Sequence, residues 1–111
     1  KIIVGAGAGK FPEVLVYDSN LSKISKRFFV DNKKLKGELG LAAGDLNGDG
    51  APEIIVAYNS GTKKQIKIFN LSGKQLSRFT ISGSFDVGPI SLGMADVDFD
   101  GKQEIVLLDG Q

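Results

Sequence analysis

The sequence predicts an all-β fold made of repeated four-stranded antiparallel units, and three observations support this class. A pattern of about 51 residues recurs along the chain of 111 residues. Apolar and polar residues alternate in segment 65–68, as expected for a strand with one buried face, and the short apolar run 14–17 also reads as a strand. The 15 glycines, about twice the usual share, indicate many tight turns. Four-stranded units at this spacing are typical of β-propeller blades, which stack because one blade cannot bury both of its faces.

The repeat is visible as two aligned segments. The stretch GLAAGDLNGDGAPEIIVA, which begins at Gly40, aligns with SLGMADVDFDGKQEIVLL, which begins at Ser91. Further upstream, IIVGAGAGKFPEVLVYDSNLSKISKRF aligns with IIVAYNSGTKKQIKIFNLSGKQLSRF. The register holds over most of the chain, which favours a true internal repeat over chance similarity.

The central copy is predicted to contain strands near residues 39–44, 53–58, 65–69 and 75–81. Residues 38–82 would then form one complete blade, residues 1–37 strands two to four of a first blade, and residues 83–111 strands one and two of a third. We therefore expect an incomplete propeller of about two blades; a two-unit β-sandwich is the alternative. Because open strand edges invite pairing, the chain is expected either to belong to a longer propeller or to complete itself as a homo-oligomer.

The glycine-rich stretch GAGAGKF, residues 5–11, does not fit a nucleotide-binding loop. A P-loop needs a glycine where Val4 stands and a hydroxyl residue where Phe11 stands. The dinucleotide fingerprint would need its third glycine at Lys10 or Pro12. Residues 13–17 read as a strand, whereas both motifs require a helix there. We expect this stretch to form the turn between the second and third strands of a blade, with residues 57–61 as its counterpart.

Composition excludes several classes of function. The chain has no cysteine and no histidine, so disulfides, thiolate chemistry and Ser–His catalysis are excluded, and no enzymatic activity is expected. The net charge is +1, and the short basic run at 33–36 lacks aromatic neighbours, so no nucleic-acid partner is expected. No apolar stretch approaches the ~20 residues of a membrane span. The sequons at Asn20 and Asn70 are explained by turn chemistry without a glycan.

Two acidic windows stand out, because they hold seven of the 13 acidic residues. Oxygen side chains at positions 1, 3 and 5 of a tight loop, a carbonyl at position 7 and a carboxylate at position 9 can converge on one cation, and glycine at position 6 allows the turn. Such an all-oxygen set favours Ca²⁺ over Mg²⁺. The first predicted site comprises Asp45, Asn47, Asp49, Ala51 and Glu53, and the second comprises Asp96, Asp98, Asp100, Lys102 and Glu104.

A simpler interpretation of these windows is a metal-free hairpin, since Asp-Gly is itself a strong hairpin signal. It accounts for Asp49-Gly50 and Asp100-Gly101 but leaves the other carboxylates unexplained, and crowded carboxylates repel one another without a cation. The windows are not EF-hands, because position 12 holds Val56 and Leu107 where a bidentate glutamate is needed. We therefore expect two calcium ions, each within a strand–loop–strand hairpin.

The segments AAGDLNGDGAPEIIVA and MADVDFDGKQEIVLL resemble the FG-GAP repeat of integrin-alpha-like and VCBS-type propellers, in a bacterial variety with a Gly-Ala-rich turn. The resemblance implies a secreted or cell-surface β-propeller with calcium in its hairpins. It further implies an adhesion role or a scaffold that binds a protein or a glycan. Two alternatives stay open: a purely structural, self-assembling repeat, and an accessory domain of a secreted enzyme.

Overall fold

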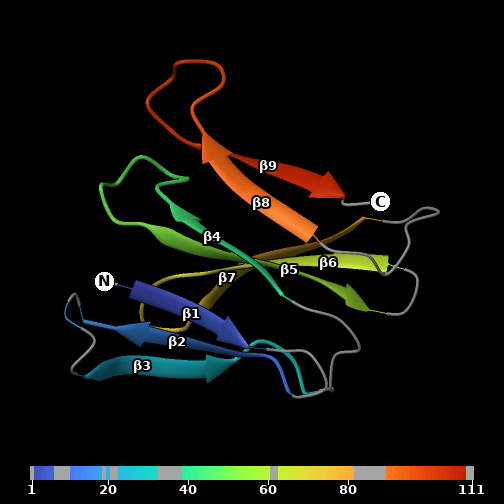
Figure 1. The fold of residues 1–111 in the computed structure, drawn as a ribbon. Coiled ribbons are helices and arrows are strands. Elements are labelled where there is room, and N and C mark those ends of the chain that lie inside the picture. Colours follow the sequence, from blue (N-terminus) through green and yellow to red (C-terminus); the bar gives the residue numbers. More distant parts are fainter. Residues whose placement is uncertain are drawn as a thin grey trace.

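The computed structural model describes residues 2–6, 11–18, 20, 23–32, 39–60, 63–81 and 90–109. The regular structure in these ranges consists of strands, arranged in three antiparallel sheets (Figure 1). The first sheet contains β1 (Ile2–Ala6), β2 (Glu13–Tyr17) and β3 (Ile24–Phe29); the second contains β4 (Gly40–Gly44), β5 (Glu53–Ser60), β6 (Lys63–Phe69) and β7 (Gln75–Ile81); the third contains β8 (Ile90–Ala95) and β9 (Glu104–Asp109). The predicted all-β class is therefore confirmed. In the described part of the chain we find no helix long and apolar enough to cross a membrane.

The four strands expected in the central copy are present in the second sheet, but the β5–β6 hairpin is longer than predicted. Asn59 and Ser60, which we expected in a turn, continue β5 and pair with Lys64 and Lys63. This part of the prediction is wrong because Lys64 Nζ donates a 2.8 Å hydrogen bond to Asn59 Oδ1, which extends the pairing beyond the apolar residues. In the corresponding stretch 5–11, Gly5 and Ala6 were likewise expected in a turn, but they continue β1 and pair with Val14 and Glu13. Residues 7–10 and the basic run at 33–36 lie outside the described residues.

The repeat seen in the sequence is also present in the backbone. The β2–β3 pair has a register shift at Val16/Tyr17, and the β6–β7 pair has one at the corresponding Ile68/Phe69. Between β6 and β7, Asn70 Oδ1 accepts hydrogen bonds from the Ser72 N–H, the Ser72 hydroxyl and the Lys74 N–H. The predicted turn chemistry of Asn70 is thus confirmed.

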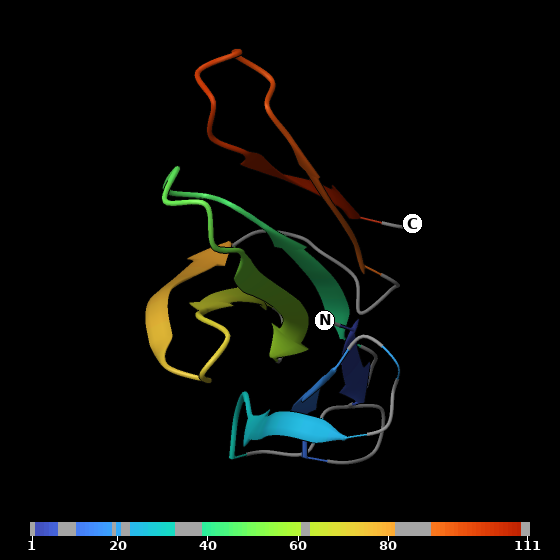
Figure 2. The same ribbon diagram turned by 90° about the vertical axis from the view of Figure 1, so that its left-hand side faces the viewer.

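The second sheet lies between the first and the third, as Figure 2 shows from the side. Its strand β5 alternates between two cores: Ile54, Val56 and Tyr58 face the first sheet, while Ile55 and Ala57 face the third. All five side chains are at most 1% exposed. A strand that is buried on both faces needs a continuous apolar sequence, which accounts for the run from Ile54 to Tyr58.

Polar contacts accompany the apolar packing between the first two sheets. The Tyr58 hydroxyl donates a 2.8 Å hydrogen bond to Asp31 Oδ2, and Lys67 Nζ donates a 2.7 Å bond to the Val30 carbonyl. The Lys67 ammonium also lies 5.8 Å from the centroid of the Tyr58 ring, within range of a cation–π interaction. Burial, followed by the hydrogen bond and charge of Asp31, raises the pKa of the Tyr58 hydroxyl above its usual value. The Tyr58 phenol therefore stays a proton donor that joins the two sheets.

Candidate metal sites

The first acidic loop, between β4 and β5, is organised around the carboxylate of its first residue. Asp45 Oδ1 accepts hydrogen bonds from the Gly48 and Asp49 N–H groups at 2.8 and 3.2 Å, and Asp45 Oδ2 accepts one from Gly50 at 2.8 Å. At the far end of the loop, Glu53 Oε1 accepts a 2.8 Å bond from the Leu46 N–H. Gly50 has a φ of 85°, so the glycine predicted at position 6 does adopt the left-handed backbone conformation.

The second loop, between β8 and β9, repeats this arrangement. Asp96 Oδ1 and Oδ2 accept hydrogen bonds from Asp100 and Gly101, at 3.0 and 2.9 Å. Glu104 Oε1 accepts a 2.9 Å bond from Val97, as Glu53 does from Leu46. The φ of Gly101 is 85°, the same as that of Gly50. The two loops therefore share one backbone design.

The predicted carboxylates come together within each loop. Oxygen atoms of Asp45, Asp49 and Glu53 lie within 4.8 Å of one another, and the same holds for Asp96, Asp98, Asp100 and Glu104. Asn47 lies in the first loop, where its Oδ1 accepts a 3.1 Å bond from the Asp49 N–H. The position-7 residues Ala51 and Lys102 donate their N–H groups to Asp49 and Asp100. Ligation by Asn47 and by the two position-7 carbonyls stays a prediction.

The carboxyl groups of the two loops differ in pKa according to their surroundings. The Gly50 N–H is the strongest of the influences that together lower the pKa of Asp45. In the second loop, the pKa of Asp98 is raised by partial desolvation, then by the hydrogen bond that its protonated carboxyl group donates to Asp100, and by the charges of Asp100 and Glu104. The Lys102 N–H is the main influence that lowers the pKa of Asp100. Desolvation and the neighbouring carboxylates of the second loop together thus raise the pKa of Asp98 and hinder its ionisation.

The donor set fits a hard divalent cation. Within the described ranges, no lysine or arginine forms an ion pair with any of the seven carboxylates, and the Arg27–Glu13 ion pair lies elsewhere. Glu53 is only 4% exposed, so its carboxyl group is buried next to the carboxyl groups of Asp45 and Asp49. A buried carboxylate is costly unless it is paired or binds a metal. A cation bound between Asp45, Asp49 and Glu53 would therefore offset the repulsion between their carboxylates.

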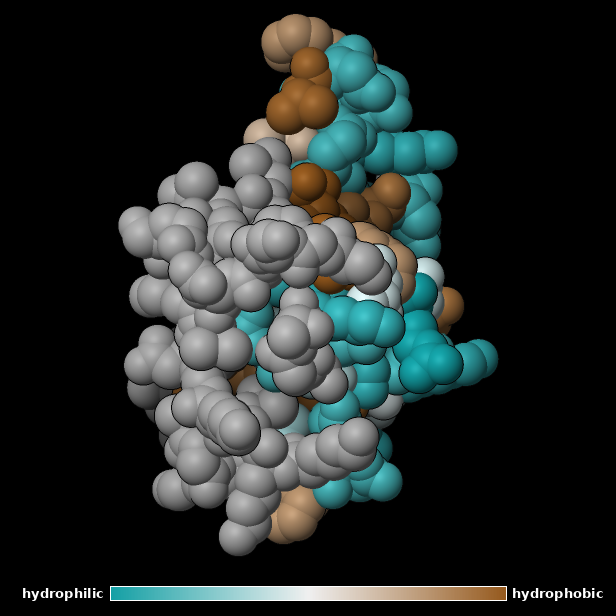
Figure 3. All heavy atoms as spheres, turned by 90° about the vertical axis from the view of Figure 1, so that its right-hand side faces the viewer, coloured by the Kyte–Doolittle hydropathy of each residue, from teal (hydrophilic) through white to brown (hydrophobic). Residues whose placement is uncertain are grey.

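Two features of the second loop were not predicted. Phe99, at position 4, has a φ of 58° where the first loop has Gly48, and its side chain is 91% exposed. Val97, at position 2, is 62% exposed, whereas the corresponding Leu46 packs against the core between the second and third sheets. At the top of Figure 3, hydrophobic atoms accordingly lie beside hydrophilic ones where the β8–β9 hairpin ends. Gly48, at position 4 of the first loop, was the sequence signal that this position adopts a left-handed backbone conformation.

Comparison with protein families gives one result. The model of the FG-GAP-like repeat family matches residues 45–107, which is more than half of the chain and includes both acidic loops. No curated protein and no solved structure matches the chain significantly.

Proposed function

The chain belongs to the FG-GAP-like repeat family, and from this membership and its two acidic loops we propose that it is a calcium-binding β-propeller module. In this proposal the module is non-catalytic and acts at the cell surface or outside the cell, as an adhesion domain or a scaffold for a protein or glycan ligand. Its three stacked sheets correspond to neighbouring blades, and each ion joins the first two strands of one blade.

The observation that carries the calcium proposal is the recurrence of one ligand arrangement in two places. The hydrogen bonds from the loop backbone to Asp45 recur at Asp96, and those to Glu53 recur at Glu104. A hairpin turn alone would require neither carboxylate. Calcium is favoured over magnesium because a flexible loop with carboxylate and carbonyl oxygens suits its longer and less strictly octahedral coordination.

Calorimetric titration of single-site variants tests the proposal. The wild-type chain is expected to bind two calcium ions, and Asp49→Ala or Asp100→Ala is expected to bind one, because each removes a central carboxylate from one loop. Glu13→Ala, which removes an acid outside the loops, is the matched control and should retain both sites. Unchanged stoichiometry in Asp49→Ala and Asp100→Ala would show that the loops are not the calcium sites.

Self-association is a second candidate role, and the exposure of Val97 favours it. Leu46 is covered by the core that includes Leu92 and Met94 of β8, whereas Val97, in the corresponding place, is 62% exposed. A blade from a second copy would cover Val97 in the way that β8 covers Leu46.

Light scattering over a range of protein concentrations measures the self-association directly. The wild-type chain should form an oligomer, and Val97→Asp should dissociate it because the contact would bury an unpaired charge. Leu76→Asp, on the outer strand β7, should leave the mass unchanged. A monomeric wild-type chain at every concentration would eliminate this second role without affecting the calcium sites.

A further inference from the structure

One residue of the second loop reaches across to the first ligand of the first loop. The Gln103 N–H donates a 3.0 Å hydrogen bond to the Asp45 carbonyl, and Gln103 Oε1 accepts a 3.2 Å bond from the Asp45 N–H. Asp45 follows Gly44, the last residue of β4, whose pairing with β5 ends at Glu53. Gln103 therefore supplies partners to both backbone groups of Asp45 just where the strand ladder stops.

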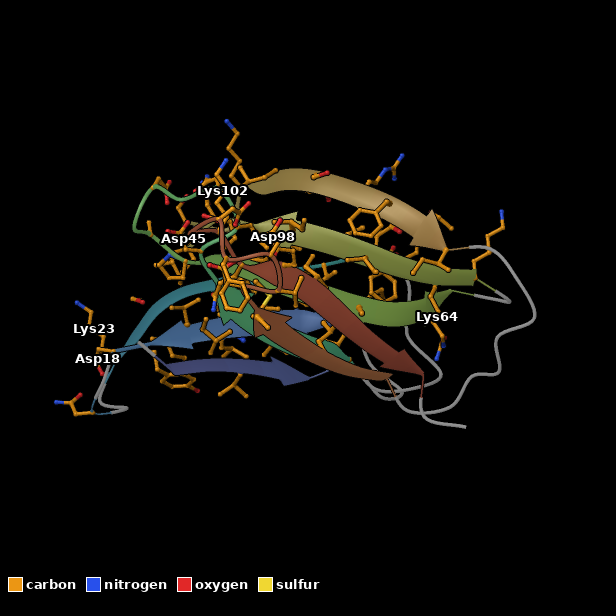
Figure 4. All side chains as sticks on the ribbon, turned by 90° about the horizontal axis from the view of Figure 1, so that it is seen from above. Asp18, Lys23, Asp45, Lys64, Asp98 and Lys102 are labelled. Atoms are coloured by element: carbon orange, nitrogen blue, oxygen red, sulfur yellow. The ribbon has the colours of Figure 1, made fainter. Side chains whose placement is uncertain are left out.

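The two loops are also packed closely around this contact. A Cβ atom on Gly44 would overlap Gln103 Oε1 and lie 2.9 Å from Met94 Cε, so only glycine fits there without movement. A Cβ on Gly48 would lie 3.4 Å from Lys102 Cγ, which places the aliphatic part of Lys102 over the first loop. Figure 4 shows Asp45, Asp98 and Lys102 gathered at one end of the sheets, with Lys64 at the other.

The position of Gln103 in its own loop links it to the second site. It directly precedes Glu104 and follows Lys102, whose N–H is bonded to Asp100 at 2.9 Å. On the other side of the contact, the Asp45 carboxylate receives the N–H groups that shape the first loop. Gln103 is thus joined through the backbone of its loop to Lys102 and Glu104, and through hydrogen bonds to Asp45.

Building on the proposed function, we propose that Gln103 is a positioning residue that couples the two calcium sites. When Asp100 and Glu104 are fixed as ligands, Gln103 between them loses freedom and holds the Asp45 backbone in its binding position. The first loop then has less disorder to lose on binding, so its affinity rises. Linkage requires the reciprocal effect of equal size on the second loop.

Calcium titrations followed by ¹⁵N NMR test the coupling, with the Gly50 and Gly101 amides as reporters of the two loops. In Asp100→Ala, the first loop should bind calcium about five-fold more weakly than in the wild-type chain, or weaker still. Asp49→Ala should lower the calcium affinity of the second loop by the same factor. Gln103→Met keeps the length of the side chain but replaces its amide acceptor by a weak one. Gln103→Met should lower the calcium affinity of the first loop by a similar factor. The double variant Asp100→Ala/Gln103→Met should show little further loss of that affinity.

Gln75→Met, on the exposed strand β7, is the matched control and should change neither affinity. A merely structural role for Gln103 would lower the thermal midpoint in EGTA and leave the two affinities coupled as before. Equal first-loop affinity in wild type, Asp100→Ala and Gln103→Met would overturn the coupling while both calcium sites stand. Absence of calcium binding in the wild-type chain would instead refute the proposed function itself.

Discussion

Removal of calcium with EGTA is expected to lower the thermal midpoint of the protein by about 20 °C. At free calcium about 100 times its dissociation constant, each site adds about 2.7 kcal/mol to the free energy of unfolding. For a domain of this size, a loss of 1 kcal/mol lowers the midpoint by roughly 4 °C. The physical reason is that three and four carboxylates lie within 4.8 Å of one another in the two loops, with backbone N–H groups as their partners. Circular dichroism during heating measures the shift.

Two controls separate calcium binding from other effects of the chelator. The double variant Asp49→Ala/Asp100→Ala should melt at the same temperature with and without EGTA, because it lacks a central carboxylate in each loop. Excess calcium should restore the wild-type midpoint, whereas the same concentration of magnesium should restore less of it. If the midpoint of the calcium-loaded wild-type protein did not move in EGTA, the ions would have no role in holding the hairpins.

The features that the sequence predicted correctly depend mainly on contacts between near neighbours. The acidic residues of the first loop lie within nine residues, from Asp45 to Glu53, so their spacing alone indicates that they converge. The positive φ at Gly50 and Gly101 follows in the same way from the place of glycine in each loop. Strand alternation likewise predicted β6, whose Ile66 is buried and whose Lys67 is not.

Two of the features that the sequence did not predict involve residues far apart in the chain. Gln103 and Asp45 are 58 residues apart, and nothing in the Lys-Gln-Glu context of Gln103 marks it as a partner of the other loop. The hydrogen bond between Tyr58 and Asp31 spans 27 residues. The length of β5 was underestimated because local patterns identify apolar residues, whereas the polar pair Asn59–Lys64 extends the strand. Stacking of the sheets, which local spacing does not describe, decides the Gln103–Asp45 and Tyr58–Asp31 contacts.

Replacement of Ile54 by alanine is expected to destabilise the protein by about 3 to 4 kcal/mol, which is typical for a fully buried isoleucine whose cavity collapses only in part. Ile54 is 0% exposed and lies in the core between the first and second sheets, with Val14 and Val16 of β2 in the same cluster. It pairs across the second sheet with Ala43 on β4 and Phe69 on β6. The side chain therefore has no room to relax towards solvent, and chemical denaturation should show a lower transition midpoint.

Leu76→Ala on the outer strand β7 is the matched control, because it removes a similar aliphatic group from a side chain that is 46% exposed. It should cost less than about 1 kcal/mol. Ile55→Ala, on the opposite face of β5, should cost as much as Ile54→Ala, because Ile55 is also 0% exposed and packs in the core towards the third sheet. A small loss for Ile54→Ala with a large loss for Ile55→Ala would mean that the first sheet is not packed on the second in solution. Equal large losses would establish that the central sheet is held from both sides, as stacked blades require.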